Sequence, residues 1–291
     1  MKRLPILGIL LLIPAVILLF GTAGCTNKTD KGKTTVAATD GGKTSPTKTE
    51  DGKGGSSEIT TAPEATIKGT IKYHGTPPEP KVDPRIAMHK DAKEGLCGTE
   101  KNQHEQVWII GKDNGVANII VSLSPPSGKK FKKLDEKHLE HFKEPVVIDQ
   151  PFCEYVPHVV ALYAPMQPLL VKTSAKMDHN VKVEAGSALG GTKDYLLKPN
   201  SDTGKISLKG GPEAVINASC SIHTWMNAKI GLFNQPYFAV TDKDGHFEIK
   251  NVPIDEEITV YLWHESNPNK VKAATHKTTK GANELKLEYP K

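Results

Sequence analysis

Four side chains in the second half of this 291-residue sequence have the chemistry to bind a soft metal ion. Cys220, His223 and Met226 follow one another with two residues between each pair, and His179 lies upstream of them. Two imidazoles, one thiolate and a weak axial thioether are the ligands of a blue-copper electron-transfer site. Sulfur ligands suit Cu(I), whereas imidazole also suits Cu(II), so such a site changes little when one electron is transferred. The pattern predicts one copper ion at a short loop between two strands, with His179 arriving from a neighbouring strand.

Other metal sites fit these residues less well. Structural zinc sites use more thiolates or imidazoles and no methionine. A dinuclear copper centre needs a second cysteine in the loop, and Ser221 to Met226 contain none. A three-histidine cluster for a second, catalytic copper is not evident either, so an enzyme is not expected. The alternative that stays open is a β-sandwich that keeps the four residues but carries no functional metal.

The amino terminus is expected to be a secretion signal. Met1 to Arg3 is basic, Leu4 to Phe20 is almost entirely apolar, and Gly21 to Cys25 consists of small residues that end on a cysteine. This order of regions is typical of a secretory signal. The final cysteine resembles that of a bacterial lipoprotein signal, in which Cys25 becomes the lipidated first residue; an uncleaved single-span anchor is the alternative. In both cases we expect the rest of the chain to be extracytoplasmic and membrane-anchored, in the periplasm or at the cell surface.

The cysteine count agrees with a metal ligand at position 220. Besides Cys25, the chain contains Cys97, Cys153 and Cys220. Two of these three can pair in an oxidising compartment, which leaves one that needs an explanation because a bare thiol would be oxidised. The simplest arrangement is a Cys97–Cys153 disulfide with Cys220 on the metal. Two unpaired thiols at 97 and 153 are the alternative.

Residues 26–64 read as a disordered tether. They are rich in Thr, Lys, Gly, Ser, Asp and Pro and contain almost no apolar side chains. Such a segment cannot bury enough surface to offset its ordering entropy. A flexible chain of this length has a root-mean-square reach of about 35 Å.

The composition excludes two broad classes. Only one long apolar run exists, which excludes a multi-span membrane protein. The formal net charge of +5 comes from scattered lysines, with no basic stripe and few aromatic residues, so no nucleic-acid partner is expected. Nothing indicates a small-molecule substrate.

The folded part is expected to be all-β. From Ile67 to Tyr73, residues alternate between the two faces of a strand. Many short strands separated by turn signals favour sandwiches or barrels. One helix is expected from Phe131 to Phe142. The further predicted strands are 107–110, 116–123, 146–148, 159–162, 169–171, 181–183, 230–233, 247–252, 258–263 and 285–289.

The metal-binding pattern also resembles a known family. Cys220 to Met226, together with His179-Asn180-Val181, resembles the type 1 copper site of the cupredoxins, particularly the amicyanin and plastocyanin group, over about residues 146–233. The resemblance implies a Greek-key β-sandwich in which His179, Cys220, His223 and Met226 bind one type 1 copper ion. It implies that the backbone N–H of Asn180 bonds the Cys220 sulfur. It also implies that His223 reaches the surface, where electrons leave.

Some residues depart from the family pattern without touching the ligand set. A proline commonly follows the second histidine, where this chain has Thr224, and an asparagine is usual near Thr173. The family also usually has a glycine near Pro165-Met166. Trp225, between two proposed ligands, is expected either to pack internally or to belong to a docking surface near His223.

Segments on both sides of the proposed copper domain have a resemblance of their own. Tyr237 to Ile249 and Val260 to Glu265 resemble the carboxypeptidase regulatory-like, transthyretin-type β-sandwich. Strands that usually begin such a domain, such as Lys68 to Ile71, lie ahead of the copper segment, so we expect one sandwich to be inserted into the other. Two sandwiches in series or one merged domain are the alternatives. The expected organisation is 1–25 signal, 26–64 tether, 65–145 first part of the regulatory-like sandwich, 146–236 cupredoxin-like domain and 237–291 the remainder.

These observations predict a membrane-anchored blue copper protein that carries single electrons between redox protein partners. One rival is a copper carrier or sensor that holds Cu(I) for delivery. The other is a structural surface lipoprotein in which the ligand set is vestigial.

Overall fold

A computed structural model describes residues 56–97 and 104–290 of the chain. The predicted signal and most of the predicted tether, including Cys25, lie outside the described residues. The described residues all belong to one compact unit. Within the described ranges, none of the helices has the length and apolar character needed to cross a bilayer.

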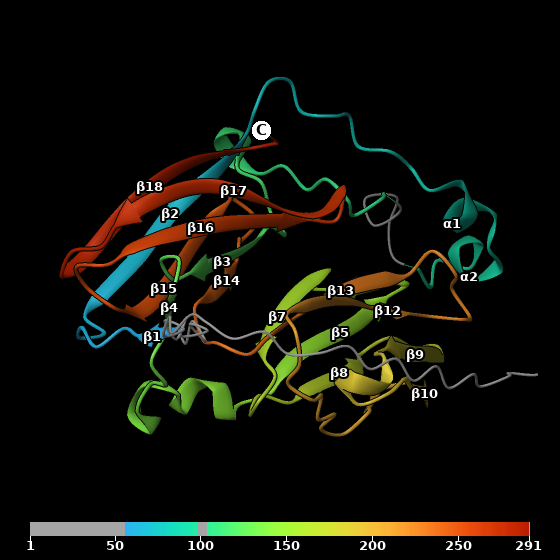
Figure 1. Cartoon of the computed structure of the whole chain (residues 1–291). Helices are drawn as coiled ribbons and strands as arrows, with labels where there is room; N and C mark the ends of the chain where they lie inside the picture. The colour runs from blue at the N-terminus through green and yellow to red at the C-terminus, as the bar shows by residue number, and fades with distance from the viewer. Residues whose placement is uncertain (1–55, 98–103, 291) are drawn as a thin grey trace, which may run out of the picture. The chain divides into compact units, whose positions relative to one another are not determined.

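The described part is built almost entirely from short strands, as predicted, and its strands form two groups (Figure 1). The helical elements are few and short. They are α1 (Pro84–Met88), α2 (Lys90–Lys93) and the 3-10 turns η2 (Lys112–Asn114), η3 (Glu136–His138), η4 (Glu140–Lys143) and η5 (Ser187–Leu189).

The first group combines strands from both ends of the described chain. One sheet has the order β14 (Phe238–Val240), β3 (Ile120–Ser124), β16 (Glu257–His264), β17 (Asn267–Lys277). The other has the order β15 (His246–Val252), β2 (Ala65–Tyr73), β18 (Gly281–Tyr289). A small parallel pair joins β1 (Ser57–Glu58) to β4 (Lys129–Lys130). Because β2 pairs with β18 and β3 with β14, strands that precede residue 146 share sheets with strands that follow residue 236.

The second group is made from the chain between these halves. Its larger sheet has the order β10 (Lys193–Leu197), β9 (His179–Glu184), β12 (Ala214–Ser219), β13 (Asn227–Phe233), β7 (Val159–Tyr163). Its smaller sheet has the order β11 (Ser201–Asp202), β8 (Leu169–Thr173), β5 (Val146–Phe152), β6 (Glu154–Val156).

The two sheets of the second group enclose a core of alternating apolar side chains. Val181 and Val183 on β9 and Ile230 on β13 face Ile148 and Val171 from the other sheet, and all five are fully buried. This is the period-two pattern expected of half-buried strands. Burial of β-branched and aliphatic side chains on both inner faces stabilises the sandwich that supports the proposed metal site.

The two groups of strands meet at a small apolar cluster. Ile120 of β3 and Trp263 of β16 pack with Val159 of β7 and Phe233 of β13. Gly231 of β13 permits this approach, because a Cβ atom there would lie 2.9 Å from the Cδ1 atom of Ile120. The side chain of Ile120 therefore packs against the backbone of β13 at Gly231.

The predicted helix from 131 to 142 is wrong. The segment contains only η3 and η4, and residues 131–135 are not helical. Leu139 and Phe142, three residues apart, turn to the same side and pack with Tyr163. That spacing suits a 3-10 turn, in which residues i and i+3 eclipse. Pro145 then disfavours helical geometry at the residue before it. The predicted strand at 107–110 is also absent, apart from a single bridge between Ile110 and Val116.

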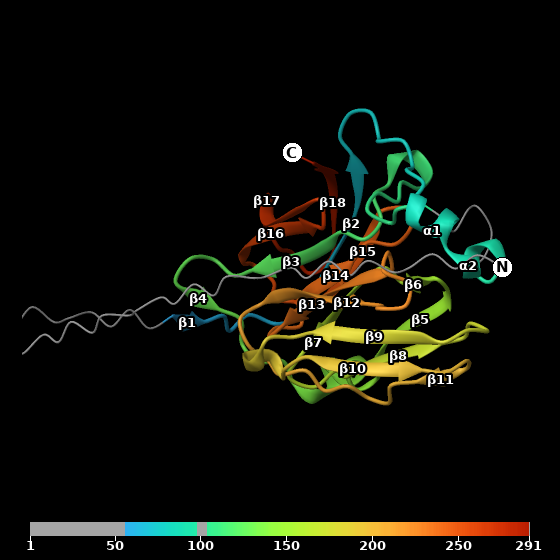
Figure 2. The same cartoon turned by 90° about the vertical axis from the view of Figure 1, so that its right-hand side faces the viewer.

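The segment with α1 and α2 lies at the end of the second group where the loop between β12 and β13 emerges (Figures 1 and 2). Asp83 caps α1 by accepting the N–H of Arg85 at 2.9 Å, and Pro84 occupies the first turn. His89 caps α2 by accepting the N–H of Asp91 at 3.3 Å. These caps define two very short helices that depend on tertiary contacts for their position.

Candidate metal centre

Sheet pairing brings the four predicted ligands to one end of the second sandwich. His179 is the first residue of β9, Cys220 directly follows β12, and Met226 directly precedes β13. Antiparallel pairing sets Ser219 beside Lys182 of β9 and beside Asn227 of β13. The strand ends that carry the ligands therefore lie next to one another, although His179 is far from the others in sequence.

The loop from Cys220 to Met226 is closed by its own backbone. The N–H of Cys220 donates to the carbonyl of Met226 at 3.2 Å, and the N–H of Met226 donates to the carbonyl of His223 at 2.8 Å. The four candidate ligand side chains are all buried, with His179 and His223 at 0% exposure. A short, hydrogen-bonded loop keeps water away and limits how far these side chains move.

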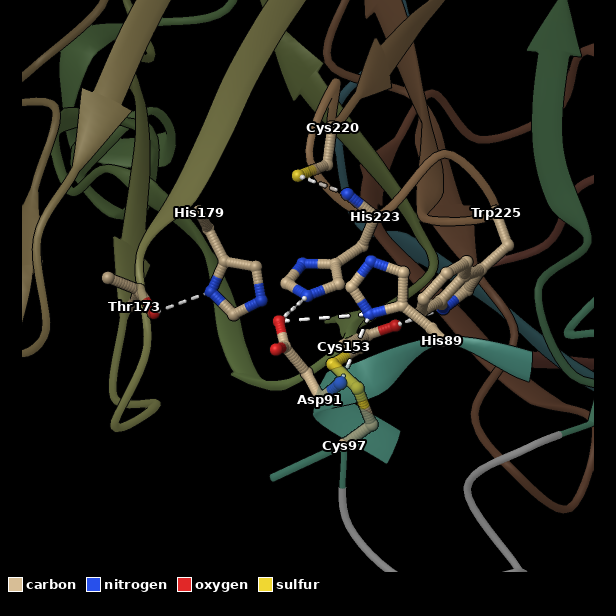
Figure 3. Close-up of a disulfide and its surroundings, with 9 residues drawn as sticks. All are labelled: His89, Asp91, Cys97, Cys153, Thr173, His179, Cys220, His223 and Trp225. Carbon is tan, nitrogen blue, oxygen red and sulfur yellow. Dashed lines mark hydrogen bonds and ion pairs between the residues drawn. A yellow bond between two sulfur atoms is a disulfide. The ribbon is translucent and has the colours of Figure 1, made fainter. Parts of the chain in front are cut away.

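The Cys220 sulfur lies in a pocket of backbone donors. It accepts the N–H of His223 at 3.4 Å (Figure 3). It also accepts the N–H of Asn180, at 3.4 Å. Cys220 is the one free cysteine in the described part of the chain. Two N–H groups directed at the buried sulfur fix its position, and sulfur of this kind is a soft ligand that suits copper.

Asn180 also fastens the loop through its side chain. Its Oδ1 atom accepts the N–H and the hydroxyl of Ser221 at 2.7 and 2.6 Å, and its Nδ2–H donates to the carboxylate of Asp194. One residue of β9 thus bonds the sulfur through its backbone and the adjoining loop residue through its side chain. This arrangement couples the position of Cys220 to that of β9.

Hydrogen bonds select one tautomer for His179. The Thr173 hydroxyl has one hydrogen, which it donates to the carbonyl of Gln150 at 3.1 Å. The same oxygen lies 3.1 Å from Nδ1 of His179, so Nδ1–H is the donor there (Figure 3). Nε2 is left with its lone pair and with no hydrogen-bond partner among the described residues. Thr173 therefore orients the imidazole.

His223 is held through its other nitrogen. Its Nε2 lies 2.9 Å from Oδ2 of Asp91, on α2, and its Nδ1 has no partner among the described residues. The rings of His179 and His223 are 4.9 Å apart between centroids. Buried nitrogens without partners are uncommon and require an explanation such as an ion. Each imidazole therefore has one engaged nitrogen and one available nitrogen.

Burial keeps both imidazoles neutral. Desolvation, assisted by the neighbouring His223, lowers the pKa of His179 to about 4. Desolvation also lowers the pKa of His223, although the Asp91 carboxylate opposes that shift. A neutral imidazole has a lone pair and is the form that binds a metal.

The types of donor atom fit copper. The donor atoms lie in the same region, but they are too widely spaced to bind one common ion without movement. In the described part, the donor groups lying within 4.8 Å of one another are Cys97–Cys153–His223 and His89–Asp91–His223. His179 and Cys220 belong to neither group. The ligand atoms of His179, Cys220 and His223 are therefore not all within 4.8 Å of one another. Ligands of one ion, with metal–ligand bonds of about 2.0–2.3 Å, lie within about 4 Å of one another. Binding would therefore require these three side chains to move closer together.

The sulfurs of Cys97 and Cys153 are not available as thiolates. The structure joins them in a disulfide with an S–S distance of 2.01 Å (Figure 3). This bond connects the end of the α2 segment to the residue between β5 and β6. It is the pairing that the sequence favours, and it leaves Cys220 as the thiol for a metal.

The structure corrects the expectation for His223 and decides between the two expectations for Trp225. The expectation that His223 reaches the surface is wrong, because Asp91 and α2 cover the ring and leave it 0% exposed. Trp225 packs internally, and its indole N–H donates to the carbonyl of Cys153 at 2.9 Å. His158 bonds Oε1 of Glu265 at 2.5 Å.

Sequence reasoning missed His89 and Asp91. No spacing rule connects them to the ligand loop, since 132 residues separate Asp91 from His223. The available signal was the expected Cys97–Cys153 bond. It places the residues just ahead of Cys97 near the strands that carry the ligands.

Comparisons with known proteins give limited similarity. No family model matches the chain, and no curated protein matches it. A reduced amicyanin mutant is 17% identical over 38% of this chain and 99% of its own, with a TM-score of 0.26. An oxidised amicyanin mutant is 15% identical over the same shares, with a TM-score of 0.27.

Proposed function

We propose that this chain is an extracytoplasmic copper protein that transfers single electrons between redox protein partners. Its type 1 site would consist of His179, Cys220, His223 and Met226. The observation that carries the proposal is the buried Cys220 sulfur with two backbone N–H donors, beside two buried imidazoles that each retain an unpartnered nitrogen. No other group of described residues combines a free thiol with two neutral imidazoles.

The chain's own residues would perform three tasks. The N–H groups of Asn180 and His223 stabilise the negative charge on the Cys220 sulfur. Thr173 and Asp91 orient the two imidazoles through the nitrogens that do not face the site. Met226, buried at the start of β13, supplies a weak thioether at the fourth position. When bound, copper supplies the one-electron couple between Cu(II) and Cu(I).

The end of a β-sandwich suits electron transfer because the conformation of its strands changes little when the charge of the site changes. His179 and Met226 adjoin paired strands, and the loop between Cys220 and Met226 is closed by two backbone bonds. Rigid donors that fully satisfy neither oxidation state keep the structural change on electron transfer small. No bond of a substrate is made or broken, so the proposal is a carrier and not an enzyme.

Membrane attachment through Cys25 is part of the proposal and derives from the sequence alone. A lipidated Cys25, followed by the predicted tether, would hold the copper domain near a membrane surface. The test is incorporation of radiolabelled palmitate by the full chain in a bacterial host. Labelling should be lost in Cys25→Ala, and an unlabelled wild type would contradict the anchor.

The test of the copper site is its colour. The purified protein, loaded with one equivalent of Cu(II), should show intense visible thiolate-to-copper absorption and bind one copper per chain by elemental analysis. Cys220→Ser should lose the absorption, and His179→Gln should weaken or lose it. His246→Gln, at an exposed histidine, is the matched control and should keep it. A colourless wild type would favour a structural β-sandwich protein with a vestigial ligand set.

A copper carrier is a second candidate, and the burial of His223 favours it. A partner protein cannot touch a ring that is covered by α2. A cavity of about 260 Å³ borders Met226 and Trp225 and is lined also by Arg85 and His158. This cavity gives access to the site from a side other than the covered His223 ring. Reversible reduction with slow copper exchange would support electron transfer. Rapid transfer of Cu(I) to a chelator would support the carrier.

A further inference from the structure

We infer that Asp91 is a positioning residue whose carboxylate holds the His223 imidazole with Nδ1 turned into the proposed copper site. The inference rests on the proposed function for its effect on copper. The orientation and tautomer of His223 are inferred from the contacts of α2 alone and do not depend on the proposed function. Figure 3 shows the carboxylate of Asp91 beside the His223 ring, on the side away from Cys220.

The contact between Asp91 and His223 joins two buried groups. Oδ2 of Asp91 lies 2.9 Å from Nε2 of His223, and both residues are buried. An ionised carboxylate only accepts hydrogen bonds, so Nε2 carries the hydrogen and Nδ1 keeps the lone pair. Nδ1 is the atom of this ring that lacks a partner among the described residues. The bond therefore selects the tautomer that presents a ligand atom to the site.

A carboxylate in this place also changes the strength of the ligand. A histidine that donates its second N–H to a carboxylate is fixed in orientation and becomes a more basic ligand. The negative charge near the ring favours the more highly charged metal ion. Asp91 should consequently stabilise bound Cu(II) more than bound Cu(I).

The neighbouring His89 does not turn this contact into a second metal site. One potential ligand atom from each of His89, Asp91 and His223 lies within 4.8 Å of the other two. However, Nδ1 of His89 already accepts the N–H of Asp91 as the cap of α2, at 3.3 Å. The His89 ring stands edge-on to His223 and to Trp225, with centroids 5.0 and 5.2 Å apart. His89 therefore acts as a wall of the pocket that encloses His223.

The segment that carries Asp91 is attached to the ligand loop on both sides. Ahead of α2, Nη1 of Arg85 donates to the carbonyl of Thr224 at 3.4 Å. Beyond α2, Cys97 is bonded to Cys153, whose carbonyl accepts the indole N–H of Trp225. These contacts keep a four-residue helix, which has little stability of its own, against the metal loop.

The experiment compares Asp91→Asn with Glu94→Gln in the full-length protein. Both substitutions remove one negative charge from the same short segment, but Glu94 is exposed and does not contact His223. Asp91→Glu retains the charge with a longer side chain and should restore part of the effect. Circular dichroism of each variant verifies that the β-structure is retained.

Two readouts are measured. In metal-free protein, 15N chemical shifts of the His223 ring should report hydrogen on Nε2 in the wild type and in Glu94→Gln, and a mixture of tautomers in Asp91→Asn. With Cu(II) as the probe, chelator competition should give a 10- to 100-fold loss of affinity in Asp91→Asn. The loss for Cu(I) should be smaller; each tenfold difference between the two ions raises the reduction potential by about 59 mV.

The outcomes separate the inference from the proposed function. A coloured wild type with Asp91→Asn indistinguishable from Glu94→Gln overturns the inference and leaves the function standing. A colourless wild type that keeps the Asp91-dependent tautomer overturns the function and leaves the orientation of His223 standing. Equal loss of Cu(II) and Cu(I) affinity, with an unchanged potential, would show that Asp91 acts only through stability and would overturn its role toward the copper.

Discussion

Trp225 donates its indole N–H to the carbonyl of Cys153 at 2.9 Å, so the proposed ligand loop is bonded to the residue that carries the disulfide. Cys153 in turn holds Cys97, six residues beyond Asp91. The chain thus forms a closed path of contacts from the ligand loop, through the disulfide and α2, back to His223.

The disulfide should stabilise the fold and the position of α2 together. Replacing both cysteines, in Cys97→Ser/Cys153→Ser, should lower the free energy of unfolding by about 2–4 kcal/mol, because the bond closes a long loop in the unfolded chain. Urea denaturation of the metal-free protein measures this. Reduced Cu(II) affinity should accompany it, since α2 loses one of its attachments. Unchanged unfolding in the double variant would contradict the expectation.

The hydroxyl of Thr173 should contribute both to the stability of the protein and to the orientation of His179. Thr173→Val removes the acceptor for Nδ1–H of His179 and leaves the carbonyl of Gln150 without this donor. Leaving a buried polar group unsatisfied costs about 1–3 kcal/mol. We therefore expect lower stability, together with weaker Cu(II) binding because the imidazole is free to turn.

Thr70→Val is the matched control for the effects of Thr173→Val on stability and on Cu(II) binding. Thr70→Val removes an exposed hydroxyl that contacts His246, far from the site in the fold. It should change neither stability nor copper affinity measurably. If Thr173→Val behaved like Thr70→Val, the orienting role of Thr173 would be wrong.

Asn180 should couple β9 to the ligand loop through its side chain. Asn180→Ala keeps the backbone N–H to the Cys220 sulfur but removes the two bonds to Ser221. Hydrogen bonds of this kind contribute about 0.5–1.5 kcal/mol each. A double-mutant cycle with Ser221→Ala measures the coupling by chemical denaturation. A coupling energy near zero would show that the two residues act independently.

The stability of the metal-free protein should depend on pH through a buried histidine outside the proposed site. Desolvation lowers the pKa of His264 to about 4. The unfolded chain, with a histidine pKa of about 6.5, binds more protons than the folded chain between these values. The free energy of unfolding should therefore fall as the pH is lowered from about 6.5 to 4. His264 contributes up to about 1.4 kcal/mol per pH unit.

Urea denaturation at several pH values measures this slope. His264→Gln should reduce the slope, whereas the exposed-site variant His246→Gln should leave it as in the wild type. Equal slopes in the wild type and in His264→Gln would contradict a depressed pKa for this residue.

Much of the sandwich could be predicted from local sequence patterns. The alternation in 67–73 and the apolar runs at 169–171, 181–183 and 230–233 correspond to β2, β8, β9 and β13. Such strands are readable because one face must be buried, and a two-residue period is the local consequence. In contrast, β12 was not predicted, although it leads directly into Cys220. Only Val215 and Ile216 of its six residues favour a strand, and pairing with β9 and β13 decides the conformation of the rest.

The amino-acid sequence by itself determined the chemistry that is available: one thiol without a partner, two imidazoles and a thioether at a spacing suited to one ion. Residue types and short spacings are local properties, so they can be read without a fold. Only the tertiary structure decided that Asp91 bonds His223 and that α2 buries the imidazole expected at the surface. A contact between residues 132 positions apart has no local signature, because it arises from strand pairing, a disulfide and the packing of a short helix that is not stable alone.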